Sequence, residues 1–491
     1  MAILIVVNDP SDLPIHFEGS ELVAAKTYLT DPGYAAMRDV KVFNLCRSYR
    51  YQSTGYYVSL LAAARGHKPI PSISTIQDLK SQTIIRVASD EVEELIQKSL
   101  APIQSTEFVL SIYFGRNMAK RHDPLCNHLF KLFESPFLRA IFVFNDKEQK
   151  WQIQNINPIA VNDIPEEHRA FVVEAASEYF QKRRKYTSRK KAPRFDLAIL
   201  FDKDEEEQPS NPKAIERFIR SSESLGMEAE LIDREDFGRL SEFDALFIRE
   251  TTSVLHHTYR FASKAAAEGL VVIDDPESIL KCTNKVFLAE LLERNKMLTP
   301  KTVIVHRENA KQITGMLGLP CILKKPDSSF SQGVIKVETE EELRLNVGKM
   351  LDRSELIIAQ EFLSTPFDWR VGVFDRQPLF VCKYYMAKKH WQIIKRDLNG
   401  LKTEDGRAET IPVEHAPTGL IRAALRAANL IGDGLYGVDI KQDGDKYYII
   451  EVNDNPNIDY GVEDAILKEE LYLRIMRVIL RRIEQRKETW Y

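Results

Sequence analysis

The 491-residue chain has few cysteines, no long apolar run and little net charge. Its five cysteines are scattered without a CxxC pair, which argues against a zinc site or a disulfide framework and fits a reducing compartment. The formal net charge of -4 gives no reason to expect nucleic acid as a partner. The first segment, MAILIVVNDPSD, lacks a basic region, and its apolar run is too short for a signal peptide or membrane helix. We therefore expect a cytoplasmic protein that does not bind membranes.

Two common nucleotide-binding patterns are also missing. No GxGxxG follows the strand DLAILF at 196–201, so we assign no dinucleotide to that region. No GK[ST] follows the serine-rich loop DSSFSQG at 327–333, so this loop is not a Walker A motif. Nucleotide binding, if present, must use another arrangement of backbone donors and lysines.

The length predicts about three domains, because one core does not grow this large. The basic run QKRRKYTSRKKAPR at 181–194 divides the chain. It is either a solvated linker or a dock for an acidic partner. Alternating strand and helix patterns on both sides predict α/β architecture, with a doubly wound, mostly parallel sheet at 195–280. In the first region, CRSYRYQSTGYY at 46–57 follows a strand and is either a binding loop or surface packing.

The stretch EVNDNPN at 451–457 closes a buried strand with polar side chains at alternate positions. Glu451, Asn453 and Asn455 would share one face of an extended strand. Oxygen donors gathered at one point suit a hard cation such as Mg²⁺. The alternative is a polar turn, because these residue types also favour turns.

The preceding strand adds Asp439, and the hairpin between the two strands turns near Asp443. With a two-residue turn at 443–444, Asp439 and Glu451 would project from opposite faces. A shared metal site therefore requires a loop with an odd number of residues or a bulge. We predict a three-residue loop at 443–445.

Three further motifs precede this hairpin. In CTNKVFLAELLERNKM, Thr283 is placed to cap a helix whose first turn carries Lys285, where the helix dipole disfavours a cation unless an anion binds. In LPCILKKPDSSFSQGVIKV, a buried strand leads to Lys324 and a small-residue loop that can enclose phosphate oxygens. In LIIAQEFLSTPFDWRVGVF, a hinge offers main-chain groups to a purine, and Asp368 and Arg370 share one face of the next strand.

Together these motifs resemble the ATP-grasp superfamily, most closely the RimK-type carboxylate–amine ligases, over roughly residues 194–482. The resemblance implies an α/β ATP-grasp fold with an α+β lid. It implies a Rossmann-like pre-ATP-grasp domain at 195–280, a lid subdomain at 281–365 and a catalytic subdomain at 366–491. Residues 1–180 would be an additional N-terminal α/β domain of unknown role, joined by the linker at 181–194.

The same resemblance assigns roles to residues. The residues implied for ATP binding are Lys285, Lys324, Ser329, Ser331, Glu361, Phe362, Leu363 and Asp368. The residues implied for the metal are Asp439, Glu451 and Asn453, and those implied near the transferred phosphoryl group and the acyl substrate are Arg370 and Asn455. Lys325 leaves the choice of strand lysine open by one position, and Ser328 stands where glycine is common in the family.

The implied reaction uses ATP with Mg²⁺ or Mn²⁺ to form an amide through an acyl phosphate, with an amino acid such as glutamate or a small peptide as substrate. Two alternatives stay open: a small-molecule kinase, and a regulatory ATP-binding module that recruits a partner. The segment VCKYYMAKKHWQIIK at 381–395 either holds an acidic substrate through Lys383, Lys388 or His390, or packs on a neighbouring domain. The substrates and a homo-oligomeric state are not determined by the sequence.

Overall fold

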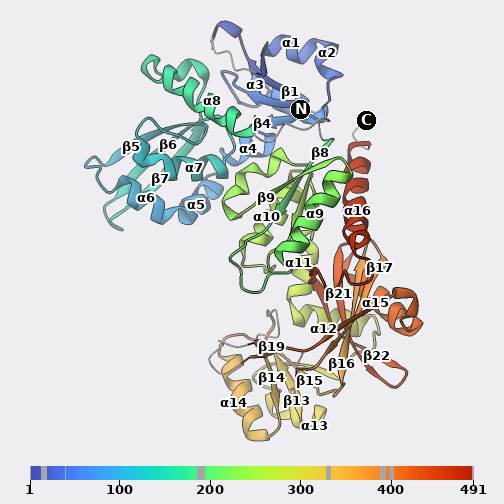
Figure 1. Cartoon of the computed structure of the whole chain (residues 1–491). Coiled ribbons are helices and arrows are strands. Elements are labelled where there is room, and N and C mark those ends of the chain that lie inside the picture. Colours follow the sequence, from blue (N-terminus) through green and yellow to red (C-terminus); the bar gives the residue numbers. More distant parts are fainter. Residues whose placement is uncertain are drawn as a thin grey trace. The chain divides into compact units, whose positions relative to one another are not determined.

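The computed structural model describes residues 2–12, 19–38, 40–184, 194–327, 333–387, 394–396 and 403–488 (Figure 1). The chain forms two compact units. Unit 1 comprises Met1–Phe195, Glu235–Phe243 and Glu484–Tyr491, and unit 2 comprises Asp196–Arg234 and Asp244–Ile483. Within the described ranges, no helix has both the length and the apolar character needed to cross a membrane.

Unit 1 begins with a parallel sheet in the order β2-β1-β3-β4. Its strands are β1 (Ala2–Val7), β2 (Ser20–Ala24), β3 (Val40–Asn44) and β4 (Lys68–Ile70), and the helices include α1 (Ala25–Thr30), α2 (Pro32–Ala35), α3 (Thr54–Ala64) and α4 (Ile73–Asp78). Ser53 caps α3 by accepting a hydrogen bond from Tyr56 N. The chain leaves α3 through Gly66, whose φ of 68° favours glycine. The α/β architecture predicted for this region is present.

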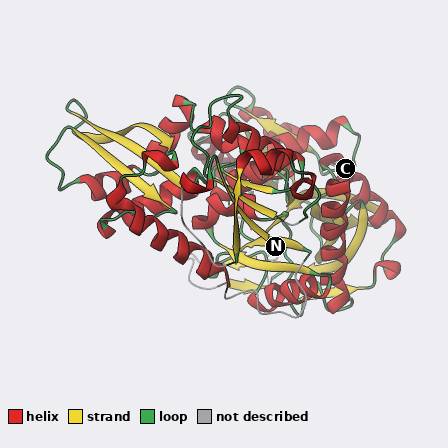
Figure 2. Cartoon of the chain, turned by 90° about the horizontal axis from the view of Figure 1, so that it is seen from above, coloured by secondary structure: helices red, strands yellow, loops and turns green. Residues whose placement is uncertain are grey.

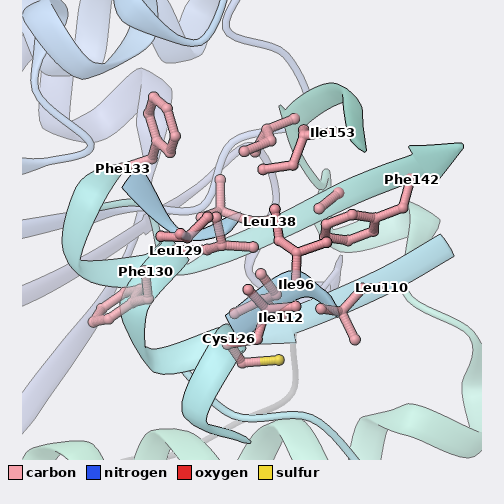
Figure 3. Packing of buried hydrophobic residues seen from close by; sticks show 14 of the residues in the cluster. Ile96, Leu110, Ile112, Cys126, Leu129, Phe130, Phe133, Leu138, Phe142 and Ile153 are labelled. Atoms are coloured by element: carbon pink, nitrogen blue, oxygen red, sulfur yellow. The ribbon is translucent and has the colours of Figure 1, made fainter. Parts of the chain in front are cut away.

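The second part of unit 1 is an antiparallel sheet in the order β5-β6-β7, with helices along one face (Figure 2). These elements are α5 (Gln82–Glu91), α6 (Glu93–Leu100), β5 (Glu107–Tyr113), α7 (Asp123–Leu132), β6 (Phe137–Asn145), β7 (Lys150–Pro158) and α8 (Arg169–Arg184). Figure 3 shows the core that they share. Leu138 and Phe142 on β6 and Ile96 on α6 are fully buried. Each such side chain contributes roughly 1.5–3 kcal/mol to stability.

Unit 2 begins with a sheet in the order β11-β10-β8-β9, in which β8, β10 and β11 pair in parallel. The elements are β8 (Phe195–Leu200), α9 (Pro212–Ser224), β9 (Met227–Ile232), β10 (Ala245–Ile248), α10 (His257–Ala267) and β11 (Val271–Ile273). The doubly wound, mostly parallel sheet predicted at 195–280 is found, including the strand predicted at 196–201. Asn211 caps α9 through a hydrogen bond from Ala214 N, and Gly226 with a φ of 85° follows that helix.

The next part of unit 2 is a small antiparallel sheet in the order β12-β15-β13-β14. It is preceded by α11 (Pro276–Thr283) and α12 (Lys285–Arg294), and it contains β12 (Thr302–Val305), α13 (Ile313–Leu317), β13 (Cys321–Lys324), β14 (Val334–Val337), α14 (Glu340–Leu351) and β15 (Ile357–Glu361). Leu323, Ala359 and Val347 belong to its apolar core.

The last sheet of unit 2 is antiparallel in the order β20-β17-β16-β21-β22. Its elements are β16 (Phe367–Phe374), β17 (Gln377–Tyr385), β20 (Ala408–Ile411), α15 (Thr418–Ile431), β21 (Leu435–Asp443) and β22 (Lys446–Asp454), followed by α16 (Glu469–Glu488). A separate ribbon pairs β18 (Ile394–Arg396) with β19 (Thr403–Asp405). One face of the large sheet packs against α15 through Val438, Val452 and Ala424, so the polar side chains of these strands lie on the other face.

Candidate active site

The hairpin between β21 and β22 turns more tightly than predicted. Asp443 pairs with Lys446, so the loop holds only Gly444 and Asp445, and the predicted three-residue loop is wrong. Gly444 has a φ of 56°, a conformation that favours glycine. Continued regular pairing from this turn would place Asp439 opposite residue 450 and send Glu451 to the other face.

A bulge one residue before Glu451 changes this register. Ile440 pairs with Ile449, whereas Asp439 pairs with Glu451, so Ile450 is the extra residue. Asp439 and Glu451 therefore lie directly opposite each other on one face. Asn453 lies two residues farther along β22, and its Nδ2 donates to Asp439 Oδ2 at 3.0 Å. A bulge was the second of the two arrangements that, from the sequence, would allow Asp439 and Glu451 to share a face.

The neighbouring strand β16 adds two charged side chains to the same face. Arg370 is the cross-strand partner of Asp439, and its Nε and one terminal nitrogen contact the two carboxylate oxygens at 2.7 and 2.8 Å. Burial favours loss of the proton from Arg370, but Asp439 outweighs burial and raises the arginine pKa above its usual value. Such a bidentate pair fixes the guanidinium orientation.

Asp368, two residues before Arg370, is held by a lysine. Lys441 Nζ contacts Asp368 Oδ1 at 2.6 Å, and Thr365 Oγ1 donates to the same oxygen at 2.9 Å. Burial raises the pKa of Asp368, and Lys441 opposes that rise. We call the surface carrying Asp368, Arg370, Asp439, Lys441, Glu451 and Asn453 the site face.

Lys285 reaches the site face from the start of α12. Its Nζ lies 2.5 Å from Glu451 Oε1, and the lysine is 7% exposed. The helix is capped by Asn284, whose Oδ1 accepts from Val286 N and Phe287 N, and not by Thr283 as predicted. Lys285 is the first helical residue, where an unpaired cation would be disfavoured and the carboxylate of Glu451 offsets the cost.

Lys324, the last residue of β13, is also buried. Burial lowers its pKa to about 8; Glu451 opposes this change, and the charge of Lys285 adds to it. Burial would raise the pKa of Glu451, but Lys285 and Lys324 hold it below its usual value. Lys324 and Glu451 thus act on each other electrostatically, across elements more than 120 positions apart in sequence.

Lys325 has a different environment. It is half-buried, its N donates to Gly333 O at 3.0 Å, and its aliphatic chain lies against Gly333. Lys324 is the buried member of the two adjacent lysines and feels the charge of Glu451. Ser329 and Ser331 lie outside the described residues, as do Lys388 and His390 of the 381–395 segment.

The predicted hinge, residues 361–363, connects the end of β15 to β16. Glu361 pairs with Lys301: its N donates to Lys301 O at 2.9 Å, and its Oε1 accepts from Lys301 N at 2.7 Å. Lys336 Nζ lies 4.5 Å from the centre of the Phe362 ring. Leu363 is half-buried. The position of the hinge is therefore fixed by the hydrogen bonds between Glu361 and Lys301 and by the cation–π contact of Phe362 with Lys336.

Asn455 is not joined to the site face by hydrogen bonds. Its φ of 46° turns the chain after β22, and its Oδ1 accepts from Arg249 at 2.6 Å. Its Nδ2 donates to Glu250 O, and its N donates to Asp274 Oδ2, each at 2.5 Å. Through these hydrogen bonds, Asn455 connects the end of β22 to the ends of β10 and β11. The contacts of Asn455 thus stabilise the fold.

The charged side chains at the site carry a small net positive charge. The cations are Lys285, Lys324, Arg370 and Lys441, and the anions are Asp368, Asp439 and Glu451. Four cations against three anions favour a polyanion such as a triphosphate. Asp439, Glu451 and Asn453 supply two carboxylates and one amide oxygen close together, a donor set that fits Mg²⁺ or Mn²⁺. Among the described residues, no group of three or more His, Cys, Asp or Glu side chains is arranged to hold a metal ion, so a metal here would also need the Asn453 amide oxygen.

Two important residues did not emerge from the sequence. Lys441 lies two residues after Asp439, so strand alternation could have placed it on the same face. Arg249 is fully buried, and its guanidinium donates to Ser210 Oγ, Pro209 O and Pro456 O as well as to Asn455. No local pattern marks Arg249, because its partners come from two distant segments.

Comparison with known proteins gives two family matches. The model of the RimK-like ATP-grasp domain matches residues 282–477, and the model of the RimK-like ATP-grasp N-terminal domain matches residues 25–175. The α-aminoadipate–LysW ligase LysX of Saccharolobus solfataricus is 28% identical over 256 residues, covering 48% of this chain and 87% of the relative. The probable α-L-glutamate ligase of Marinomonas sp. is 22% identical over 294 residues, covering 56% of this chain and 93% of the relative.

Solved structures also resemble the chain in part. A RimK domain protein from Sphaerobacter thermophilus has a TM-score of 0.45 with 17% identity, covering 58% of this chain and 99% of its own. The D-alanine–D-alanine ligase of Bacillus anthracis complexed with ATP has a TM-score of 0.46 with 14% identity, covering 60% and 99% respectively.

Proposed function

Because the chain belongs to the RimK-like ATP-grasp family and is an ADP-forming ATP-grasp ligase, we propose that it joins a carboxylate to an amine through an acyl phosphate. The observation that carries this proposal is the site face, where Asp439 and Glu451 lie opposite each other beside Lys285 and Arg370. The proposal is supported by the gathering of carboxylate oxygens and positively charged groups on this one face.

The residues take the following roles in the proposal. Lys285, Lys324 and Arg370 bind the ATP phosphates, Asp368 binds the ribose, and the main chain of residues 361–363 binds adenine. Asp439, Glu451 and Asn453 hold Mg²⁺ or Mn²⁺, which when bound lowers the cost of charge on the transferring phosphoryl group. Ser329 and Ser331 donate to phosphate oxygens, and Asn455 supports this arrangement by fixing the chain after β22.

The proposed chemistry has two steps. A substrate carboxylate oxygen attacks the γ-phosphorus, the bond from this phosphorus to the β,γ-bridging oxygen breaks, and ADP leaves. The amine nitrogen then attacks the acyl carbon, the bond to the phosphate oxygen breaks, and phosphate leaves with the proton lost by nitrogen. Arg370 and the two lysines stabilise negative charge in the first step, and their fixed ion pairs reduce the reorganisation needed.

For the substrate, we propose an amino acid such as glutamate or a small peptide. The support comes from the names of the relatives, an α-aminoadipate–LysW ligase and probable α-L-glutamate ligases. The site face itself recognises phosphate and metal, so it does not discriminate among carboxylates.

The test is ADP release with Mg²⁺ and pools of amino acids and small peptides, with hydroxylamine added as a neutral nucleophile that converts an acyl phosphate to a hydroxamate. We expect hydroxamate from one carboxylate in the pool. Glu451→Gln should lower the rate at least about 1,000-fold while circular dichroism stays unchanged. Asp443→Asn, which removes a charge from the exposed turn of the same hairpin, should keep the wild-type rate.

Two results would overturn the proposal. One is a stable phosphorylated alcohol in place of hydroxamate, since this would make the protein a kinase. The other is Mg²⁺-dependent ATP turnover by Glu451→Gln at the wild-type rate, since Glu451 would then have no part in the site.

A further inference from the structure

The sheet β11-β10-β8-β9 of unit 2 has a topological switch point that the proposed ATP site does not use. β9 lies on one side of β8 and β10 lies on the other. The chain segments that leave β8 and β10 therefore diverge at the carboxyl ends of these strands, the usual place for a ligand in such a sheet. Glu205 belongs to the segment after β8, and Glu250 belongs to the segment after β10.

Glu250 has a carboxylate oxygen without a partner. The residue is 2% exposed, and its Oε2 accepts from His257 Nε2 at 2.6 Å. Its Oε1 is buried and has no hydrogen-bond partner among the described residues. A buried acceptor left unpaired is costly, so a donor from outside the chain is expected here. The adjacent Arg249 is not this donor, because its nitrogens contact Ser210, Asn455 and backbone carbonyls.

Glu205 brings a second negative charge to the same place. Its Oε1 and Oε2 accept from Thr251 N at 3.1 and 3.3 Å, so it lies directly beside the segment that carries Glu250. Burial raises the pKa of Glu205, hydrogen bonds from Thr251 oppose the rise, and the charges of Glu250 and Asp202 add to it. Both neighbouring charges that act on Glu205 are therefore negative.

This pair lies close to the end of β22. Glu250 O accepts from Asn455 Nδ2 at 2.5 Å. Asn455 is two residues beyond Asn453, a path of at most roughly 7 Å. The segment that carries Glu250 is thus hydrogen-bonded to the residue that directly follows β22, the strand of Glu451 and Asn453.

We propose that Glu250 and Glu205 form a binding site for the amine substrate and that this substrate carries a net positive charge, as a diamine or a basic amino compound does. The proposal rests on the ligase function and names its amine partner. An ammonium group supplies three donors and a positive charge, which suits the free Oε1 of Glu250. The segment 202–207, DKDEEE, contains five acidic residues and one lysine, so it disfavours an anionic amine. An amino acid such as glutamate, or a small peptide, then serves as the carboxylate substrate.

The first experiment compares amines in the ligase assay, with 1,4-diaminobutane as the cationic amine, L-glutamate as the anionic amine and hydroxylamine as the neutral reference. We expect kcat/KM for 1,4-diaminobutane to exceed that for L-glutamate at least ten-fold. Glu250→Gln should lower the ratio of kcat/KM for 1,4-diaminobutane to that for hydroxylamine about 10- to 100-fold, mainly through KM. Glu216→Gln, which removes an exposed charge on α9 outside this segment, should leave this ratio unchanged.

Equal or better use of L-glutamate, with hydroxamate still formed, would overturn this inference and leave the ligase proposal intact. Absence of hydroxamate with every carboxylate would instead overturn the ligase proposal. Calorimetric titration with 1,4-diaminobutane keeps the two apart, because it needs no turnover: the inference requires binding that Glu250→Gln weakens at least ten-fold. If Glu250→Gln fails to fold, Glu205→Gln, at a half-buried position, is used in its place and must weaken this binding. Unchanged binding of 1,4-diaminobutane by Glu205→Gln would refute the proposal.

Discussion

Replacing Lys324 with methionine should stabilise the protein while it abolishes ATP turnover. The lysine is 7% exposed, and its pKa falls from 10.5 to about 8, chiefly because of burial. A difference of this size corresponds to roughly 3 kcal/mol of destabilisation of the charged form in the folded protein. Glu451 loses one of its cationic neighbours in the variant, which offsets part of the gain. We therefore expect a net gain of about 1–3 kcal/mol near neutral pH.

The pH dependence has a definite sign. Because the pKa of Lys324 is lower in the folded protein, the unfolded chain binds more protons between about pH 8 and pH 10.5. The free energy of unfolding contributed by Lys324 therefore rises with pH across this window. The advantage of Lys324→Met over the wild type is fully present below pH 8 and disappears as the pH approaches 10.5.

The assay is urea denaturation without nucleotide, because bound ATP would itself stabilise the folded state. It is repeated at several pH values and paired with ADP release at pH 7. Lys325→Met is the matched control, since Lys325 is adjacent and only half-buried, and it should not reproduce the gain in stability at pH 7. The reasoning is refuted if Lys324→Met is less stable than the wild type at pH 7, or if its advantage persists at pH 10.5.

Three other substitutions test separate parts of unit 2. Arg249→Met removes the donor from three buried acceptors, Ser210 Oγ, Asn455 Oδ1 and Pro456 O, and should lower the free energy of unfolding by about 3–5 kcal/mol. Arg220→Met on the exposed face of α9 should change the urea midpoint little. Asp368→Asn should raise KM for ATP about 10-fold, and an unchanged KM would remove Asp368 from the nucleotide site. Arg370→Lys loses the bidentate contact and should lower kcat about 100-fold without loss of folded protein by circular dichroism.

The strand and helix pattern of the Rossmann-like sheet followed from the sequence alone. The predicted mostly parallel sheet between residues 195 and 280 is present, because short apolar runs, caps such as Asn211 and glycines such as Gly226 act locally. The likeness to ATP-grasp ligases could also be inferred, since its motifs lie within continuous stretches of chain.

Side-chain placement at the site required the tertiary structure. The register of β21 and β22 depends on a bulge at Ile450, and an isoleucine at this position does not indicate a bulge. The predicted three-residue loop was wrong because this bulge, and not the loop, supplies the extra residue. Asn455 was expected to share the face of Asn453, but a positive φ turns it toward Arg249. Strand alternation breaks at both points, so it fails where the backbone departs from a regular strand.

The sequence by itself thus determined which residue types would be available: lysines before and within a small sheet, an arginine on a strand, and carboxylates at a strand end. The tertiary structure decided which of them act together. Lys324 is buried where the charge of Glu451 acts on it, and Glu250 Oε1 is buried without a hydrogen-bond partner among the described residues. The physical reason is that burial and charge pairing depend on neighbours far away in the chain, which local sequence does not encode.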